Sequence, residues 1–462
     1  MHFSIPDTQE LKDENSTPYT SFNIHINGVF HCSVRYSALY AFHEQLQKEF
    51  GSKSLPPFPP KKLLPLSGPK LDERRLMLEK YIQIVSQEPV IASSDAFNGF
   101  LLSAQQETQK EQAESVTLDV FLMNGHRIPL NIMSTDQTEE VLETVASQID
   151  LPEELVYYFG LYLVKKEDKG DNSIVRKFQD FESPYISLKS ANKEATHRIV
   201  MRKSYWDPAY DDDLLENKVA MNLLYVQVTN DIERQWVLAT KDQLKHLSTL
   251  QERNSKREYL RMARTLKYYG YIQFRSSLTD YPKSNSRVLI AAGNQELNFR
   301  VEVSPGTIKE GVFKITRIRC WRITTTINNG SGTSNNSSMS QLELSFEYLM
   351  AKDKLQWVTV SSDQAILMSM CLQGMVEELI NKKQGKKIKR PQDKVKKTRK
   401  GLSRDSSIPT GINRQVSSPE QIKSDGQPVK KILNHRQYGL GMQNGDAVTN
   451  SAFDDAIGDD DL

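Results

Sequence analysis

The chain has 462 residues, of which 38% are hydrophobic and 26% charged, and its formal net charge is +2. This length predicts about three domains, and the near-neutral charge argues against a general polyanion-binding protein. The three cysteines lack paired spacing, which argues against a disulfide framework or a zinc site and fits a reducing compartment. Because no apolar run approaches ~20 residues and the first residues lack a signal-peptide core, we expect a cytoplasmic protein that reaches membranes from solution.

The first segment predicts a small α+β unit. Alternating residues 22–26 and 30–34 flank Asn27-Gly28, a strong hairpin signal. Three helices are expected: one after Ser37, a second at about 71–87 and a third at about 97–106. The unit is expected to end near residue 108, and the polar stretch 105–114 is typical of a linker.

Positive charge gathers around a proline run within this unit. Arg35 ends a predicted strand, Lys61 and Lys62 follow the proline-rich run 56–60, and Arg74 falls near the inward side of the next helix. Arginine matches phosphate in a bidentate manner, and the prolines form a stiff loop that delivers the lysines. Salt bridges at Arg35 and Arg74, and a rigid linker or proline-reading ligand at the prolines, are the alternatives.

Three further units follow in order. Two strands, 116–123 and 126–132, precede a helix at 138–148 and further strands, which is the order of a ubiquitin-like fold. Residues 204 to about 270 have helical periodicity. Strands return from about 287 to 361, and a last helix runs from 363 to about 382. The predicted fold class is therefore multidomain α+β.

The strand 317–323 and the final helix suggest a recognition surface. Alternation places Trp321 beside Arg317 and Arg319 on the polar face, opposite Ile318 and Cys320. The helix carries two apolar stripes; one can pack on the sheet, and the second, with Val376 near Gln373, is then free for a peptide. Cover by a neighbouring lobe is the alternative for both features.

The last eighty residues lose the pattern of a packed core. Residues 382–400 are strongly basic, and the polar segment up to 450 predicts disorder. The basic run is typical of a solvated linker, and it can also attract acidic lipids. The chain ends in Ile457-Gly458-Asp459-Asp460-Asp461-Leu462, an acidic collar before an apolar residue that a partner could capture or that only solubilises the tail.

The sequence shows no enzyme signature. It lacks a Gly-rich phosphate loop with a following lysine, a His-Glu-x-x-His motif, a Gly-x-Ser-x-Gly motif and the protein-kinase motif set. None of the eight histidines has metal-ligand spacing. We expect no catalytic residue, no metal and no cofactor.

These residues resemble the PX–FERM sorting nexins. The PX features are Arg35-Tyr36-Ser37, the loop 55–61 and Arg74 four residues before Leu78; the FERM features include 204–207, 320–322 and 355–359. The resemblance implies a PX domain at 1–108, a FERM F1 ubiquitin-like lobe at 115–203, an F2 helical lobe at 204–285, an F3 phosphotyrosine-binding (PTB)-like lobe at 286–383, and a disordered tail at 384–462.

The resemblance also implies lipid recognition by the first unit. Its expected ligand is phosphatidylinositol 3-phosphate on the cytosolic face of early endosomes. Arg35 would hold the 3-phosphate, with Tyr36 stacked under the inositol ring and Ser37 completing the motif. Lys61 or Lys62 would meet the 1-phosphate, and Arg74 would bond the ring hydroxyls. Leu63 and Leu64 would enter the bilayer.

For the FERM lobes, the resemblance implies an adaptor that recycles receptors to the plasma membrane. The F3 lobe would bind Asn-Pro-x-Tyr, Asn-x-x-Tyr or Asn-x-x-Phe motifs of lipoprotein-receptor and integrin tails through Arg319, Trp321, Gln373 and Val376. Residues 457–462 would recruit the Retriever part of the Commander complex. The alternative is a FERM scaffold that links receptors to the cytoskeleton or to Ras-type GTPases through F1. We expect a monomer that binds no nucleic acid.

One further hypothesis concerns the tail itself. Asn450-Ser451-Ala452-Phe453 has the Asn-x-x-Phe form of the expected ligand. Asn450 and Phe453 could therefore occupy the F3 groove in cis, and a receptor tail would then displace them and release Leu462.

Overall fold

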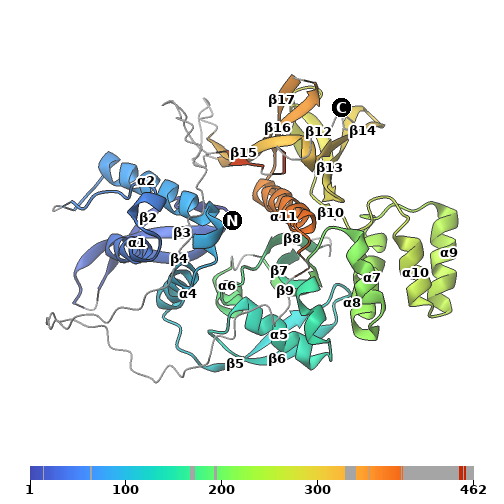
Figure 1. Ribbon diagram of the computed structural model, residues 1–462, viewed down its shortest axis with the longest axis horizontal. Coiled ribbons are helices and arrows are strands. Elements are labelled where there is room, and N and C mark those ends of the chain that lie inside the picture. Colours follow the sequence, from blue (N-terminus) through green and yellow to red (C-terminus); the bar gives the residue numbers. More distant parts are fainter. Residues whose placement is uncertain are drawn as a thin grey trace, which may run out of the picture.

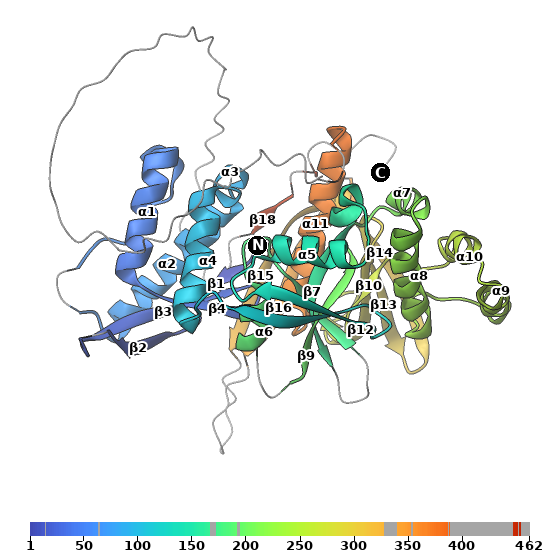
Figure 2. The ribbon, with the colours of Figure 1, turned by 90° about the horizontal axis from the view of Figure 1, so that it is seen from below.

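The structure is a computed structural model. It describes residues 1–13, 15–62, 65–166, 172–191, 195–327, 340–352, 354–386, 388, 447–450 and 452–453. Among these residues no helix is long and apolar enough to cross a membrane. Figures 1 and 2 show the amino-terminal unit at one end, the helical lobe at the other, and helix α11 between them.

The first unit packs four helices against a four-stranded antiparallel sheet. Its elements are β1 (Phe3–Ser4), β2 (Thr8–Lys12), β3 (Pro18–Ile26), β4 (Val29–Arg35), α1 (Tyr36–Phe50), α2 (Pro69–Gln87), α3 (Pro89–Ala92), α4 (Asp95–Gln109) and the short η1 (Ser52–Ser54). Strand β3 is central and pairs with β1, β2 and β4. The β3–β4 turn is the predicted one, since Asn27 and Gly28 both adopt the positive φ that a tight hairpin requires.

The second unit has a five-stranded sheet covered by a helix. Its elements are β5 (Ser115–Phe121), β6 (Arg127–Met133), α5 (Thr138–Gln148), η2 (Glu153–Tyr158), β7 (Phe159–Lys166), β8 (Asn172–Lys177), α6 (Pro184–Ser190) and β9 (His197–Lys203). The strand order is β6-β5-β9-β7-β8, with β5 and β9 parallel. This is the topology that the hairpin–helix–strand order predicts for a ubiquitin-like lobe.

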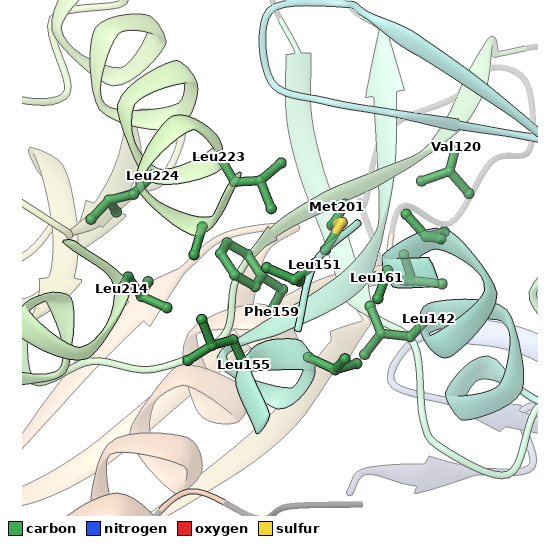
Figure 3. Packing of buried hydrophobic residues seen from close by; sticks show 14 of the residues in the cluster. Val120, Leu142, Leu151, Leu155, Phe159, Leu161, Met201, Leu214, Leu223 and Leu224 are labelled. Carbon is green, nitrogen blue, oxygen red and sulfur yellow. The ribbon is translucent and has the colours of Figure 1, made fainter. Parts of the chain in front are cut away.

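The third unit is helical and shares its core with the second. It contains η3 (Pro208–Tyr210), α7 (Asp211–Leu215), α8 (Lys218–Glu233), α9 (Lys241–Glu252) and α10 (Lys256–Ala263). Figure 3 shows Leu214, Leu223 and Leu224 of this unit approaching Phe159 and Leu155 of the second. One continuous apolar cluster therefore joins the two lobes.

The fourth unit is a strongly bent antiparallel sheet that packs on α11. Its elements are β10 (Ile272–Gln273), β11 (Ser277–Thr279), β12 (Ser286–Gly293), β13 (Glu296–Ser304), β14 (Thr307–Lys314), η4 (Ile315–Arg317), β15 (Ile318–Ile327), β16 (Ser340–Ala351), β17 (Lys354–Ser361), α11 (Ala365–Lys383) and β18 (Val448–Thr449). The order is β14-β13-β12-β11-β17-β16-β15-β18, and β10 pairs with β12. The last strand thus comes from the carboxyl-terminal tail.

The first and second units meet through buried polar contacts. Gln105 of α4 is 1% exposed; it donates to Ser187 Oγ at 2.9 Å and accepts from the Ser183 amide at 2.9 Å. Phe181 of the second unit packs in the core of the first. The prediction that 105–114 is a linker was therefore wrong at its start. Helix α4 continues to Gln109, and the Gln105 side chain bonds across the junction.

A buried histidine, His31, packs edge-on against Phe181 at this junction, and its burial predicts that stability depends on pH. Burial lowers the pKa of His31 to about 4 from 6.5, and its Nε2 lies 3.0 Å from the Leu101 carbonyl. The fold favours the neutral ring, so its contribution is complete above pH 6.5 and is lost as the pH falls towards 4. We expect a loss of about 2 kcal/mol between pH 7 and 5 that His31→Gln removes. Chemical denaturation at both pH values measures it. Exposed His126→Gln is the control, and equal pH dependence in His31→Gln and wild type would contradict the prediction.

Helix α11 is also bonded to the connection between the second and third units. The Glu378 carboxylate accepts from the amides of Trp206 at 2.8 Å and Asp207 at 2.6 Å. A side chain at Gly374 would lie 2.9 Å from the Trp206 indole nitrogen, so only glycine allows this approach. The helix that borders the fourth sheet is therefore held in place by the other lobes.

Candidate functional site

Arg35 lies where β4 meets the amino terminus of α1. It is itself the N-cap of α1, and no side chain caps the first turn, which begins with Tyr36 and Ser37. Free amides at a helix amino terminus attract anions. The guanidinium lies 3.8 Å from the Tyr19 ring centroid and 3.9 Å from an Asp13 oxygen, and the side chain is 45% exposed. The salt bridge considered from the sequence is present but long, so Arg35 remains accessible to a ligand.

An aromatic cluster holds the proline loop against α1. Phe58 packs against Tyr36, Tyr40, His43 and Tyr81 with centroid separations of 4.7–5.8 Å. The Tyr36 hydroxyl, whose pKa burial raises further above neutrality, donates to the Pro59 carbonyl at 2.7 Å. The loop is therefore fixed by ring packing at Phe58 and by one hydrogen bond, in addition to its prolines.

This cluster brings the remaining cations to the same place. Arg74 of α2 donates to the Pro60 carbonyl at 3.0 Å, and its guanidinium lies 4.3 Å from the Tyr36 centroid. The Lys61 ammonium lies 3.6 Å from the Tyr40 centroid, and Lys62 follows it exposed. Lys61 and Arg74 thus lie on the Tyr36–Tyr40 edge of the cluster, and Arg35 directly precedes Tyr36 in the chain. Leu63 and Leu64 lie outside the described residues.

The second candidate site is the edge of β15, which the tail occupies. Strand β18 pairs antiparallel with β15, with Val448 opposite Trp321 and Thr449 opposite Cys320. The Asn450 amide extends the pairing by donating to the Arg319 carbonyl at 3.0 Å. This is strand addition, a mode in which main-chain bonds provide affinity and alternate side chains provide specificity.

Asn450 is the most specifically held residue of this segment. It is 1% exposed; its Nδ2 donates to the carbonyls of Ile315 at 2.9 Å and Ile318 at 2.6 Å. Its Oδ1 accepts from the Ala452 amide at 2.9 Å, and its carbonyl accepts from the Phe453 amide at 3.1 Å. The side chain thus uses its donor and acceptor groups at once, and an aspartate would lack the donors.

The prediction from alternation that Trp321 is exposed was wrong. Trp321 is 2% exposed, belongs to the core, and donates from Nε1 to Ser369 Oγ of α11 at 2.9 Å. A β-bulge between Ile318 and Cys320 adds one residue, so Ile318 and Trp321 both face inward. Trp321 remains beside the added strand, but its backbone and not an exposed ring meets Val448.

The second stripe expected on α11 is occupied and not free. Val376 is 5% exposed and lies in the core cluster that includes Trp321 and Ala452. Gln373 bonds to the Met1 amino group at 3.0 Å and to Glu377 at 2.9 Å, so it lies beside the first unit. Contact with another lobe, the alternative, is therefore present at Gln373, whereas Val376 shares its cluster with the tail residue Ala452 and its role in cargo binding stays a prediction. Arg319 is exposed, forms an ion pair with Glu347, and meets the tail through its carbonyl.

Sequence reasoning missed several residues of these sites. Tyr40 and Phe58 pack together beside the cations of the first site. The carbonyls of Ile315 and Ile318 accept hydrogen bonds from Asn450. Val448 carried a usable signal, since an apolar residue two before Asn450 reaches the same face of an added strand. Carbonyl positions carry no such signal. Residues 457–462, expected to bind a partner, lie outside the described residues.

Comparisons with known proteins cover most of the chain. Family models match a PX domain (22–104), the F1 lobe of the sorting nexin 17/27/31 FERM domain (116–206), the F2 lobe of the sorting nexin 17/31 FERM domain (207–267) and the sorting nexin 17 FERM C-terminal domain (270–380). Sorting nexin-17 of Danio rerio is 48% identical over the whole of both chains. Sorting nexin-17 of Homo sapiens is 50% identical over 84% of each chain. Human sorting nexin-31 is 37% identical over 82% of this chain and 86% of its own.

The chain is a PX–FERM protein of the sorting nexin family. Within that family it is a homologue of sorting nexin-17. These proteins are non-enzymatic adaptors, and membership implies endosomal sorting. The PX domain implies phosphoinositide binding with peripheral attachment to endosomal membrane, and the FERM lobes imply binding of protein tails.

Proposed function

We propose that this chain is an endosomal cargo adaptor that binds phosphatidylinositol 3-phosphate and receptor-tail motifs at the same time. Arg35, Tyr36, Ser37, Lys61, Lys62 and Arg74 bind the lipid headgroup, and Leu63 and Leu64 enter the bilayer. The edge of β15 takes an Asn-Pro-x-Tyr or Asn-x-x-Phe segment. Captured receptors of the lipoprotein-receptor and integrin types are recycled to the plasma membrane instead of being degraded in lysosomes.

The observation that carries this proposal is the tail segment on β15. An Asn-x-x-Phe sequence lies there as an added strand, with Asn450 bonded to the carbonyls of Ile315 and Ile318. A ligand with the same motif can make the same bonds. The tail is therefore an internal competitor, and a bound receptor displaces it and releases residues 457–462 for the Retriever part of the Commander complex.

Membrane attachment compensates for the weak binding expected of a short added strand. Such a peptide buries little surface, so we expect an affinity on the order of micromolar. When the lipid site and the receptor share one membrane, the second binding event takes place at a high effective concentration. Adaptor function therefore requires both sites in one chain.

A vesicle flotation assay tests the proposal. A fluorescent, lipid-free peptide with one Asn-Pro-x-Tyr motif is mixed with the full chain and vesicles that do or do not contain phosphatidylinositol 3-phosphate. We expect the peptide to float only with both the chain and this lipid present. Equal flotation with any anionic lipid would refute the lipid assignment, and equal flotation of a peptide with Ala in place of the motif Asn would refute the cargo assignment.

A further inference from the structure

The amino-terminal strand β1 lies between α2, which carries Arg74 of the proposed lipid site, and α11, which borders the peptide groove. One edge of β1 pairs with β3, with Phe3 opposite Ile26 and Ser4 opposite His25. Its other edge faces α2, the helix that begins at Pro69 and carries Arg74. An exposed strand edge presents unpaired amides and carbonyls, and here side chains of a helix satisfy them.

Three α2 side chains at four-residue spacing bind this edge. Arg75 donates from Nη1 to the Ile5 carbonyl at 2.5 Å, and Glu79 accepts from the Ile5 amide at 2.6 Å. Gln83 accepts from the Phe3 amide at 2.7 Å and donates to the Met1 carbonyl at 3.2 Å. Residues four apart share one helix face, so this row is a continuous attachment between α2 and the strand.

The same region of the first unit contacts α11. The Met1 amino group donates to Gln373 Oε1 at 3.0 Å. At the β3–β4 turn, a β-carbon on Gly28 would lie 3.0 Å from Ile366 Cδ1, which shows a close approach of the hairpin to the first turn of α11. Two hydrogen bonds join these contacts. The Asn27 backbone amide donates to the His2 carbonyl at 2.8 Å, and the His2 amide donates to the side-chain Oδ1 of Asn27 at 2.9 Å.

Helix α11 in turn supports the peptide groove. Ser369 accepts the Trp321 indole hydrogen bond, and Trp321 pairs with Val448 of the added strand. Val376 lies in the apolar cluster that contains Ala452. A path of packed and hydrogen-bonded residues therefore runs from Arg74, through α2, residues 1–5 and α11, to the groove.

We propose that the amino-terminal strand couples the phosphoinositide site to the peptide groove. In the structure, Arg74 at the start of α2 donates a hydrogen bond to the Pro60 carbonyl. A headgroup that binds Arg74 replaces this bond. The next residue, Arg75, transmits the change to Ile5, and the row of bonds transmits it to α11. Coupling of this kind is reciprocal, so peptide binding alters lipid affinity by the same factor.

This inference rests on the proposed function, since it names how the two proposed sites regulate each other. Soluble dibutanoyl phosphatidylinositol 3-phosphate is added to the full chain, its binding is measured by calorimetry, and amide exchange of residues 1–5 and 365–376 is followed by mass spectrometry. We expect saturation to change exchange in both segments by roughly fivefold, the lower end of common allosteric effects.

Gln83→Glu isolates the path. It retains an acceptor for the Phe3 amide but removes the donor to the Met1 carbonyl, so the lipid should still bind while the α11 response disappears. Gln83→Ala is the second variant, and Gln87→Ala, an exposed glutamine of the same helix, should respond like wild type. Saturated lipid binding without an α11 response, or an unchanged response in both Gln83 variants, would overturn this inference alone. Absence of lipid binding would overturn the proposed lipid function with it.

Discussion

Asn450→Ala is expected to raise the affinity of the full chain for a receptor-motif peptide by about tenfold or more. The change removes two hydrogen bonds to the carbonyls of Ile315 and Ile318 and one from the Ala452 amide. At about 1 kcal/mol net for each bond, the tail loses roughly 2–3 kcal/mol of its hold on the groove. The apparent affinity of a competing ligand rises with the fraction of open groove. Calorimetry with an Asn-Pro-x-Tyr peptide measures it.

The matched control for this prediction is Asn444→Ala, the same substitution earlier in the tail. It should bind the peptide as wild type does. The variant Asn450→Asp should behave like Asn450→Ala, because its carboxylate lacks the two donors and places charge against two carbonyls. If Asn450→Ala and wild type bind the peptide equally, the tail does not compete for the groove.

Arg35→Ala is expected to weaken binding to vesicles with phosphatidylinositol 3-phosphate by roughly 100-fold. Arginine contacts to phosphate are charge-assisted and bidentate, and loss of one such partner costs about 2–5 kcal/mol. Arg35 also stands at the start of α1, so its loss leaves the helix amides as the main remaining partners of the 3-phosphate, while Lys61 and Arg74 remain for the rest of the headgroup. Vesicle pelleting across a phosphoinositide series measures both strength and selectivity.

Arg127→Ala is the control for the charge change alone. Arg127 is an exposed residue of β6 that bonds Asp119 at 2.9 Å, away from the proposed lipid site. Its variant should pellet like wild type, whereas Arg74→Ala should weaken binding by a smaller factor than Arg35→Ala. Undiminished pelleting of Arg35→Ala, or equal wild-type binding to every phosphoinositide, would contradict the lipid assignment.

Local patterns in the sequence were enough to predict most elements of the fold. The Asn27-Gly28 turn, helix α5 at 138–148 and the final helix near 365–383 all follow from periodicity and turn chemistry. Such features depend on residues close in the chain. The family followed from Arg35-Tyr36-Ser37, the proline loop and the FERM motifs, and the comparisons confirm it.

The errors arose where residues far apart in the chain meet. Trp321 lies in the core and not on the surface because a bulge at Ile318–Cys320 changes which residues face inward. Strict alternation cannot detect an inserted residue. The outer side of α11 was expected to be free, yet the first unit covers it at Ile366 and Gln373. Apolar periodicity identifies a buried face but not the element that buries it.

The sequence by itself determined the order of the lobes, the family and the types of side chain available for phosphate and for an Asn-x-x-Phe ligand. The tertiary structure decided where those groups lie. It alone placed the tail on the edge of β15, with Asn450 bonded to the carbonyls of Ile315 and Ile318. It alone placed residues 1–5 between α2 and α11. The reason is physical: every residue except proline has the same main-chain groups, so only the folded arrangement shows which of them remain available for binding.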